Sequence, residues 1–208
     1  MKKRIPVYLI GLFVMAFGVV LIKKANLGMS PLSAIPAAIA NFTPLTLGNS
    51  TIGFHVLCTI LQIALTRKIT VKTVLLLPLA VIFGYIIDLY MFVLKFSVLA
   101  YWLRFVLCFF GVVFTALGIV IIVTVDLMLP APDSFLQSAS LHFNRPLGQI
   151  KIIGDVTWVV VAVIIEFINT NTVVSVGIGT LVSMYLTGKF VGIIRDRLPW
   201  LKEYLSAD

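Results

Sequence analysis

Apolar residues form long continuous runs along this chain, and short polar or charged stretches separate them. Three of these runs, 5–22, 74–87 and 111–125, contain no charged residue. A helix needs about 20 apolar residues to cross the roughly 30 Å hydrocarbon layer of a membrane. Because the runs are continuous rather than alternating, they predict helices and not strands. The pattern is that of an all-α integral membrane protein.

The runs and their flanking residues predict six membrane-spanning helices, at 5–22, 48–66, 73–94, 99–125, 148–168 and 172–193. Two further segments, 31–43 and 132–143, are too short to cross. Ser30 before Pro31 opens the first segment, and Pro132-Asp133-Ser134 opens the second, both typical helix starts. We expect each segment to form a short re-entrant or interfacial helix.

The sequence nearly repeats itself at an offset of about 100 residues. Gly11 and Gly18 recur as Gly111 and Gly118, and the Pro and Ser residues that follow recur in the same order. We therefore divide the chain into a first repeat, 1–97, and a second repeat, 98–208, the latter ending in a cytoplasmic tail. Because each repeat has three spans, an odd number, the two repeats should be inverted relative to one another.

The distribution of positive charge agrees with this layout. With six crossings and both termini in the cytoplasm, 12 of the 16 Lys and Arg residues lie on the cytoplasmic side. With eight crossings, 11 of these 16 residues would lie on the cytoplasmic side, so the charge distribution favours six crossings only slightly. The length of the segments is the stronger argument for six crossings. The net charge of +8 is then a topology signal rather than a nucleic-acid-binding feature.

Three stretches resemble the YczE/YyaS/YitT-like family of bacterial integral membrane proteins. They are Leu27-Gly-Met-Ser-Pro-Leu-Ser33, Leu129-Pro-Ala-Pro-Asp-Ser134 and Val176-Gly-Ile-Gly-Thr180. In that family a Gly-Leu-Gly-x-x-Pro-x-Asp stretch follows the first helix, and Val-Gly-x-Gly-Thr opens the last. This chain departs from the pattern at Ser33, where an Asp is common, and keeps Asp133. The resemblance implies a multi-pass protein of the bacterial inner membrane and supplies no substrate.

Ionisable residues inside apolar segments are candidates for function, because they are costly there unless paired or hydrated. Asp133 begins a short helix, where the helix dipole favours a carboxylate, and helix capping is the alternative. Asp88 lies within an apolar span with no neutralising residue in its own helix. We predict that these two acids carry the binding function together.

Other polar residues have stronger structural alternatives. His55 aligns with Asp155 in the repeat, and Asp155 is spaced to pair with Lys151 one turn earlier. Glu166 ends the fifth span and is expected at the membrane interface. The full set of predicted substrate-binding residues is Asp133, Ser134, Asp88, Ser30, Ser33, His55, Asp155 and Ser183.

The sequence contains no nucleotide-binding loop, Ser/His/Asp pattern or metal-ligand cluster, so we expect no enzyme and no cofactor. We predict a transporter or facilitator of a small solute, with its site between the repeats and with cation or proton coupling left open. The alternatives are a substrate-binding membrane subunit of a vitamin-type importer and a non-transport accessory protein. The expected partners are the lipid bilayer and an unidentified small molecule, not nucleic acid, and a homodimer is left open.

Overall fold

In the computed structural model, the described residues, 4–198, form eight α-helices. The helices are α1 (Arg4–Ala25), α2 (Pro31–Phe42), α3 (Leu47–Thr66), α4 (Val71–Val93), α5 (Tyr101–Val125), α6 (Ala131–His142), α7 (Leu147–Thr170) and α8 (Ile178–Arg197). The first seven begin and end within three residues of the predicted ranges. The last begins at Ile178 instead of 172. The part of the predicted tail beyond residue 198 lies outside the described residues.

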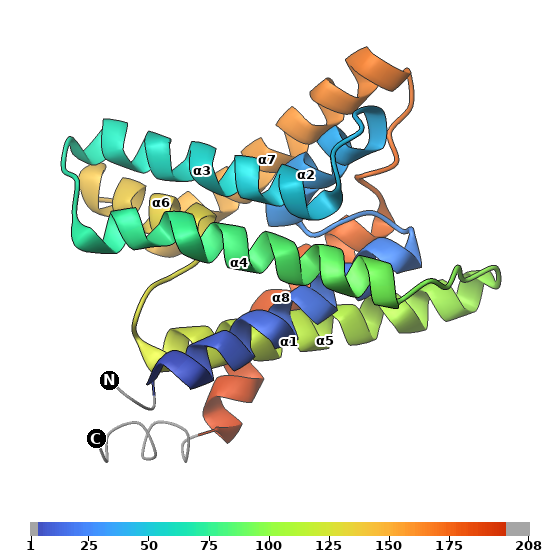
Figure 1. Ribbon diagram of the computed structural model, residues 1–208, viewed down its shortest axis with the longest axis horizontal. Coiled ribbons are helices and arrows are strands. Elements are labelled where there is room, and N and C mark those ends of the chain that lie inside the picture. Colours follow the sequence, from blue (N-terminus) through green and yellow to red (C-terminus); the bar gives the residue numbers. More distant parts are fainter. Residues whose placement is uncertain (1–3, 199–208) are drawn as a thin grey trace. The chain divides into compact units, whose positions relative to one another are not determined.

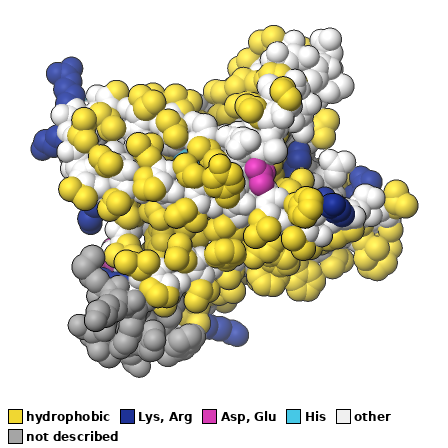
Figure 2. Space-filling model, in the orientation of Figure 1, with side chains coloured by type: hydrophobic (Ala, Val, Ile, Leu, Met, Phe, Trp, Pro, Cys, Tyr) yellow, Lys and Arg dark blue, Asp and Glu magenta, His cyan; other side chains and the backbone are white. Residues whose placement is uncertain are grey.

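Five of the described helices are long and apolar enough to cross a membrane: α1, α3, α4, α5 and α7. These helices make the chain an all-α, multi-pass membrane protein. Figure 2 shows hydrophobic side chains over much of the visible face, with Lys and Arg at its edges. The predicted sixth span corresponds to α8, which is not among the five and carries Lys189, Arg195 and Arg197. A sixth crossing stays a prediction.

The helices repeat in order and in length. A short helix follows α1 and another follows α5, and these two, α2 and α6, lie 100 residues apart in the sequence. The ends of α1 and α5 match as well: Asn26 and Asp126 follow them in the left-handed conformation, with φ of 52° and 53°. This conformation is tolerated better by Asn and Asp than by most residues, and it stops the helix. The sequence repeat is thus a repeat of local structure.

The described part of the chain divides into two compact units. Unit 1 holds residues 4–30, 89–127 and 177–198, and unit 2 holds 31–88 and 128–176. Each unit takes helices from both halves of the sequence, so the units do not coincide with the repeats 1–97 and 98–208. The repeat boundary itself stays a prediction.

In unit 1, α1 and α5 pack against each other in antiparallel fashion (Figure 1). Gly11 lies against Ile122, and the equivalent Gly111 lies against Ile22. Two turns further along α1, Gly18 lies against Thr115. The equivalent Gly118 lies against Met15. Residue numbers rise along α1 in the direction in which they fall along α5. Each contact between the two helices recurs at the equivalent pair of positions, with the glycine on the other helix. Such reciprocal contacts define a pseudo-two-fold axis between the two helices. The glycines let the two backbones approach closely.

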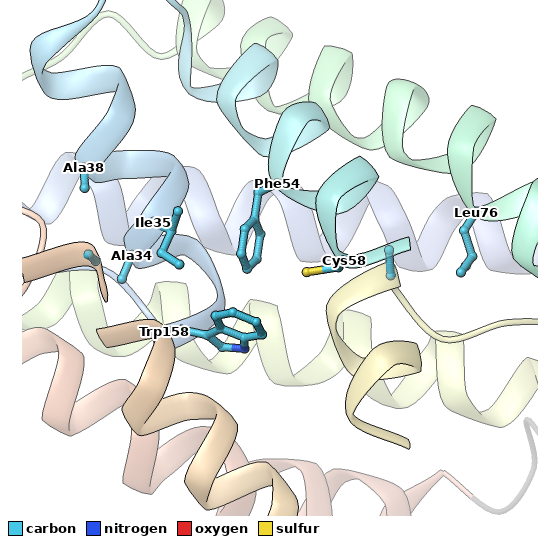
Figure 3. Packing of buried hydrophobic residues seen from close by; sticks show 9 residues of the cluster. Ala34, Ile35, Ala38, Phe54, Cys58, Leu76 and Trp158 are labelled. Atoms are coloured by element: carbon cyan, nitrogen blue, oxygen red, sulfur yellow. The ribbon is translucent and has the colours of Figure 1, made fainter. Parts of the chain in front are cut away.

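In unit 2, the two short helices pack against the same two long helices. Helix α2 packs against α3 and α7, while α6 packs against α7 and α3. The N-terminal parts of both short helices reach one apolar cluster, which holds Ala34, Ile35, Phe54, Ala131 and Trp158 among others. Figure 3 shows Phe54 and Trp158 facing each other within it. The short helices are therefore built into the core of unit 2.

Candidate functional site

The first turn of α6 places Asp133 next to α7. Pro130 and Pro132 open this helix, since a proline in the first turn loses no helical hydrogen bond. Asp133, the third residue of the helix, lies where the partial positive charge of the helix N-terminus stabilises a carboxylate. Its side chain is 16% exposed. The position agrees with the prediction that Asp133 belongs to the start of a short helix.

Lys151 of α7 binds two carboxylates at once. Its Nζ lies 2.9 Å from Oδ1 of Asp133 and 3.3 Å from Oδ1 of Asp155. The pairing with Asp155, four residues later in the same helix, confirms the predicted intrahelical contact. The bridge to Asp133 crosses between helices and was not predicted. We call Asp133, Lys151 and Asp155 the charged cluster, and with both acids ionised it has a net charge of −1.

His55 lies on α3, which packs against α6, the helix of Asp133. Its side chain is buried and its ring stacks on that of Phe83, with the ring centroids 5.6 Å apart. The structure therefore brings together two of the predicted residues, Asp133 and Asp155, through Lys151, and places His55 on a neighbouring helix.

Trp158 follows Asp155 by three residues on α7 and was not among the predicted site residues. Its ring packs against Phe54 of α3 and Phe135 of α6, with centroid distances of 5.3 and 6.2 Å. Its Nε1 is buried and has no acceptor among the described residues. A buried indole N–H normally finds a partner, because leaving it unpaired costs free energy. The sequence signal was its depth in the 148–168 span, which made it a candidate for lining a pocket.

Asp88 has a different set of contacts. Near the C-terminal end of α4, it accepts hydrogen bonds from Oγ1 of Thr46, at 2.6 Å, and from the backbone N–H of Gly48, at 2.8 Å. Both donors belong to the start of α3, whose N-cap is Thr46. In the described structure, Asp88 shares no partner with the charged cluster. The joint role predicted for Asp88 and Asp133 stays a prediction.

The predicted serines are distributed over both units. Ser33 of α2 and Ser134 of α6 are half-buried in unit 2. Ser30, after α1, and Ser183, buried in α8, belong to unit 1. Only Ser134 is next in sequence to a member of the charged cluster.

Glu166 lies one turn before the end of α7, and its side chain is fully buried within the protein. Its expected position at the membrane interface stays a prediction. One carboxylate oxygen accepts a hydrogen bond from Nδ2 of Asn41, at 2.6 Å. The other accepts from the backbone N–H groups of Val174 and Ser175 and from the Ser175 hydroxyl. These bonds tie the 171–177 segment to the end of α7, which explains why the last helix starts only at Ile178. No local pattern in the sequence reveals this role.

Residues 2–196 match the model of one protein family, described as a family of unknown function, DUF6198. The chain belongs to this family. No curated protein and no solved structure matches the chain. The DUF6198 match includes the charged cluster, His55 and Trp158. The resemblance to YczE/YyaS/YitT-like proteins stays a prediction.

Proposed function

We propose that this DUF6198 protein is a transporter or facilitator of a small solute, and that the charged cluster is its binding site. The observation that carries the proposal is a cluster of two acids and one lysine among apolar helices of membrane-spanning length. Ionisable groups in such helices are expensive and usually mark a pathway or a binding site. A pair of acids with a single base leaves one negative charge that a cation or a proton can neutralise.

The helix arrangement supports the same function. The cluster and its surroundings use α6 and α7 from the second half of the chain and α3 from the first. The antiparallel pairing of α1 with α5 relates equivalent helices by a pseudo-two-fold axis. Inverted repeats in transporters place substrate and coupling-ion sites where the repeats meet. We infer that the cluster occupies such a position.

Reconstitution of the purified protein into vesicles tests the proposal. A panel of small organic cations would be applied outside, and solute uptake measured with a pH-sensitive dye inside to detect coupled protons. Asp155→Asn is the informative variant, because it removes the excess charge and leaves Lys151 paired with Asp133. We expect uptake of at least one cation by the wild-type protein and at least about a tenfold loss in Asp155→Asn, equivalent to one lost charged hydrogen bond.

Thermal unfolding of the two proteins serves as the control for folding. Uptake that is equal in the wild type and in Asp155→Asn would contradict a role for the cluster. A complete lack of flux, together with co-purification of a membrane ATPase pair, would instead identify a substrate-binding subunit of an importer.

A further inference from the structure

The charged cluster already holds an alkylammonium group. The Nζ of Lys151 lies between two carboxylate oxygens, at 2.9 and 3.3 Å. These are the distances expected for an ammonium with charge-assisted hydrogen bonds. The Lys151 side chain is 40% exposed, whereas the two acids are 16% and 15% exposed. The acids are thus the fixed, buried part of the site, and the lysine is the part that can leave.

Trp158 supplies a second, independent indication of a ligand. The residue is only 8% exposed, and its Nε1 lacks an acceptor among the described residues. Asp155 and Trp158 are three residues apart on α7, so their side chains emerge on the same face with Cβ atoms about 5–6 Å apart. A donor without a partner therefore lies one helical turn from an acid whose charge is incompletely neutralised.

The neighbouring rings place this donor at the junction of α6 with α7. The Trp158 ring contacts Phe135, which follows Asp133 by two residues on α6. The Trp158 ring also contacts Phe54 of α3, and Figure 3 shows the Cys58 sulfur directed toward the Phe54 ring. Lys151, Asp155 and Trp158 follow one another at spacings of four and three residues, so they lie on the same face of α7. The acids and the indole N–H thus belong to one side of this helix.

We propose that this site binds a small primary amine that carries a hydrogen-bond acceptor, such as a hydroxyl oxygen, on a neighbouring carbon. The ammonium takes the place of Lys151 Nζ between Asp133 and Asp155, and the oxygen accepts the hydrogen bond from Trp158 Nε1. The inference rests on the proposed function, since it names the class of solute for that site.

Two amines of similar size test separately how the site recognises the ammonium group and the oxygen. Ethanolamine has the ammonium and the oxygen, whereas ethylamine has the ammonium alone, and glycolate serves as an anionic control. Binding to the purified full-length protein would be measured by titration calorimetry and by the shift in thermal unfolding temperature. We expect ethanolamine to bind about tenfold more tightly than ethylamine, as one hydrogen bond to a buried donor would give, and glycolate not to bind.

Trp158→Phe is the matched variant, because it keeps the aromatic ring and removes only the N–H. It should weaken ethanolamine binding about tenfold and leave ethylamine binding unchanged. Lys151→Met should strengthen the binding of both amines, since the competing ammonium is gone. If Lys151→Met is poorly folded when free, the amines should raise its unfolding temperature more than that of the wild type.

The outcomes distinguish this inference from the proposed function. Binding of ethanolamine without flux into vesicles would support the ligand class and contradict transport. Flux of another solute, with neither amine bound, would support transport and overturn the ligand class. Equal weakening of both amines by Trp158→Phe would overturn the role of the indole N–H.

Discussion

At the scale of single residues, the acidic side chains of unit 2 are stabilised in three different ways. Glu166 has both oxygens occupied by neutral donors. Asp88 accepts hydrogen bonds from the N-terminal end of α3. Asp133 and Asp155 share one lysine, whose side chain is 40% exposed. Only in the last arrangement are the acids bound to a charged group that is itself half-exposed. For this reason we propose ligand binding at the charged cluster and a structural role for Glu166.

Glu166→Gln tests the structural role of this buried acid. The amide keeps the size of the side chain but replaces one acceptor oxygen by a donor, so at least one of its four donors loses its partner. We expect thermal or denaturant unfolding to show a loss of about 1–3 kcal/mol, with ligand affinity unchanged in the folded protein. Asp196→Asn is the control, since that side chain is 77% exposed and should be neutral to substitution. A stable Glu166→Gln protein would contradict the assignment.

At the scale of helices, close approach of backbones determines how elements pair. Gly48 of α3 faces the Gly84 carbonyl and the Asp88 carboxylate of α4, and a Cβ there would collide with both. Gly53, one turn and a half further along α3, has open space around it. The same helix therefore contains one glycine required by packing and one that packing does not require.

Gly48→Ala and Gly53→Ala should have opposite effects. The first forces α3 and α4 apart and disturbs the Asp88 contacts, and we expect it to destabilise the protein by about 1–3 kcal/mol. The second improves helix propensity without a clash and should stabilise the protein by about 0.5–1 kcal/mol. Thermal unfolding in one detergent would compare the two. Equal changes in both variants would argue against the close α3–α4 contact.

Disulfide cross-linking tests the antiparallel pairing of α1 with α5. In a background with Cys58 and Cys108 replaced by Ala, the pair Gly11→Cys and Ile122→Cys should cross-link, because a Cβ at position 11 lies against the side chain of residue 122. The equivalent pair, Ile22→Cys and Gly111→Cys, should do so too. A parallel arrangement would instead join positions 11 and 111, which lie about 16 Å apart along an antiparallel pair.

The periodicity of the sequence was sufficient to predict the helices. It was insufficient to predict the contacts between residues far apart in the sequence. The prolines at the starts of α2 and α6 and the matching glycines of α1 and α5 act locally, so they predicted the helices and their repeat. The start of α8 depends on Glu166 holding Ser175, and the bridge from Lys151 to Asp133 joins two helices. Neither contact has a signature at helical spacing. The same is true of Trp158, whose importance depends on the absence of an acceptor in the described structure.

At the scale of the whole molecule, a site between inverted repeats requires the two halves to have opposite orientations in the membrane. The α1–α5 pair relates equivalent helices by a two-fold axis perpendicular to their length. If both helices cross the membrane, equivalent positions of the two halves face opposite sides. Crossing by the 12-residue helices α2 and α6 as well would make α1 and α5 parallel, which disagrees with their antiparallel contacts.

The most direct test of this claim is the side from which two equivalent loop positions can be labelled. Leu45, between α2 and α3, and Arg145, between α6 and α7, are exposed and 100 residues apart. Each would be changed to Cys in the background without Cys58 and Cys108 and treated with a membrane-impermeant thiol reagent in intact and in permeabilised cells. We expect Leu45→Cys to react in intact cells and Arg145→Cys to react only after permeabilisation. Reaction of both from the same side would contradict the inverted arrangement and, with it, a site formed between inverted repeats.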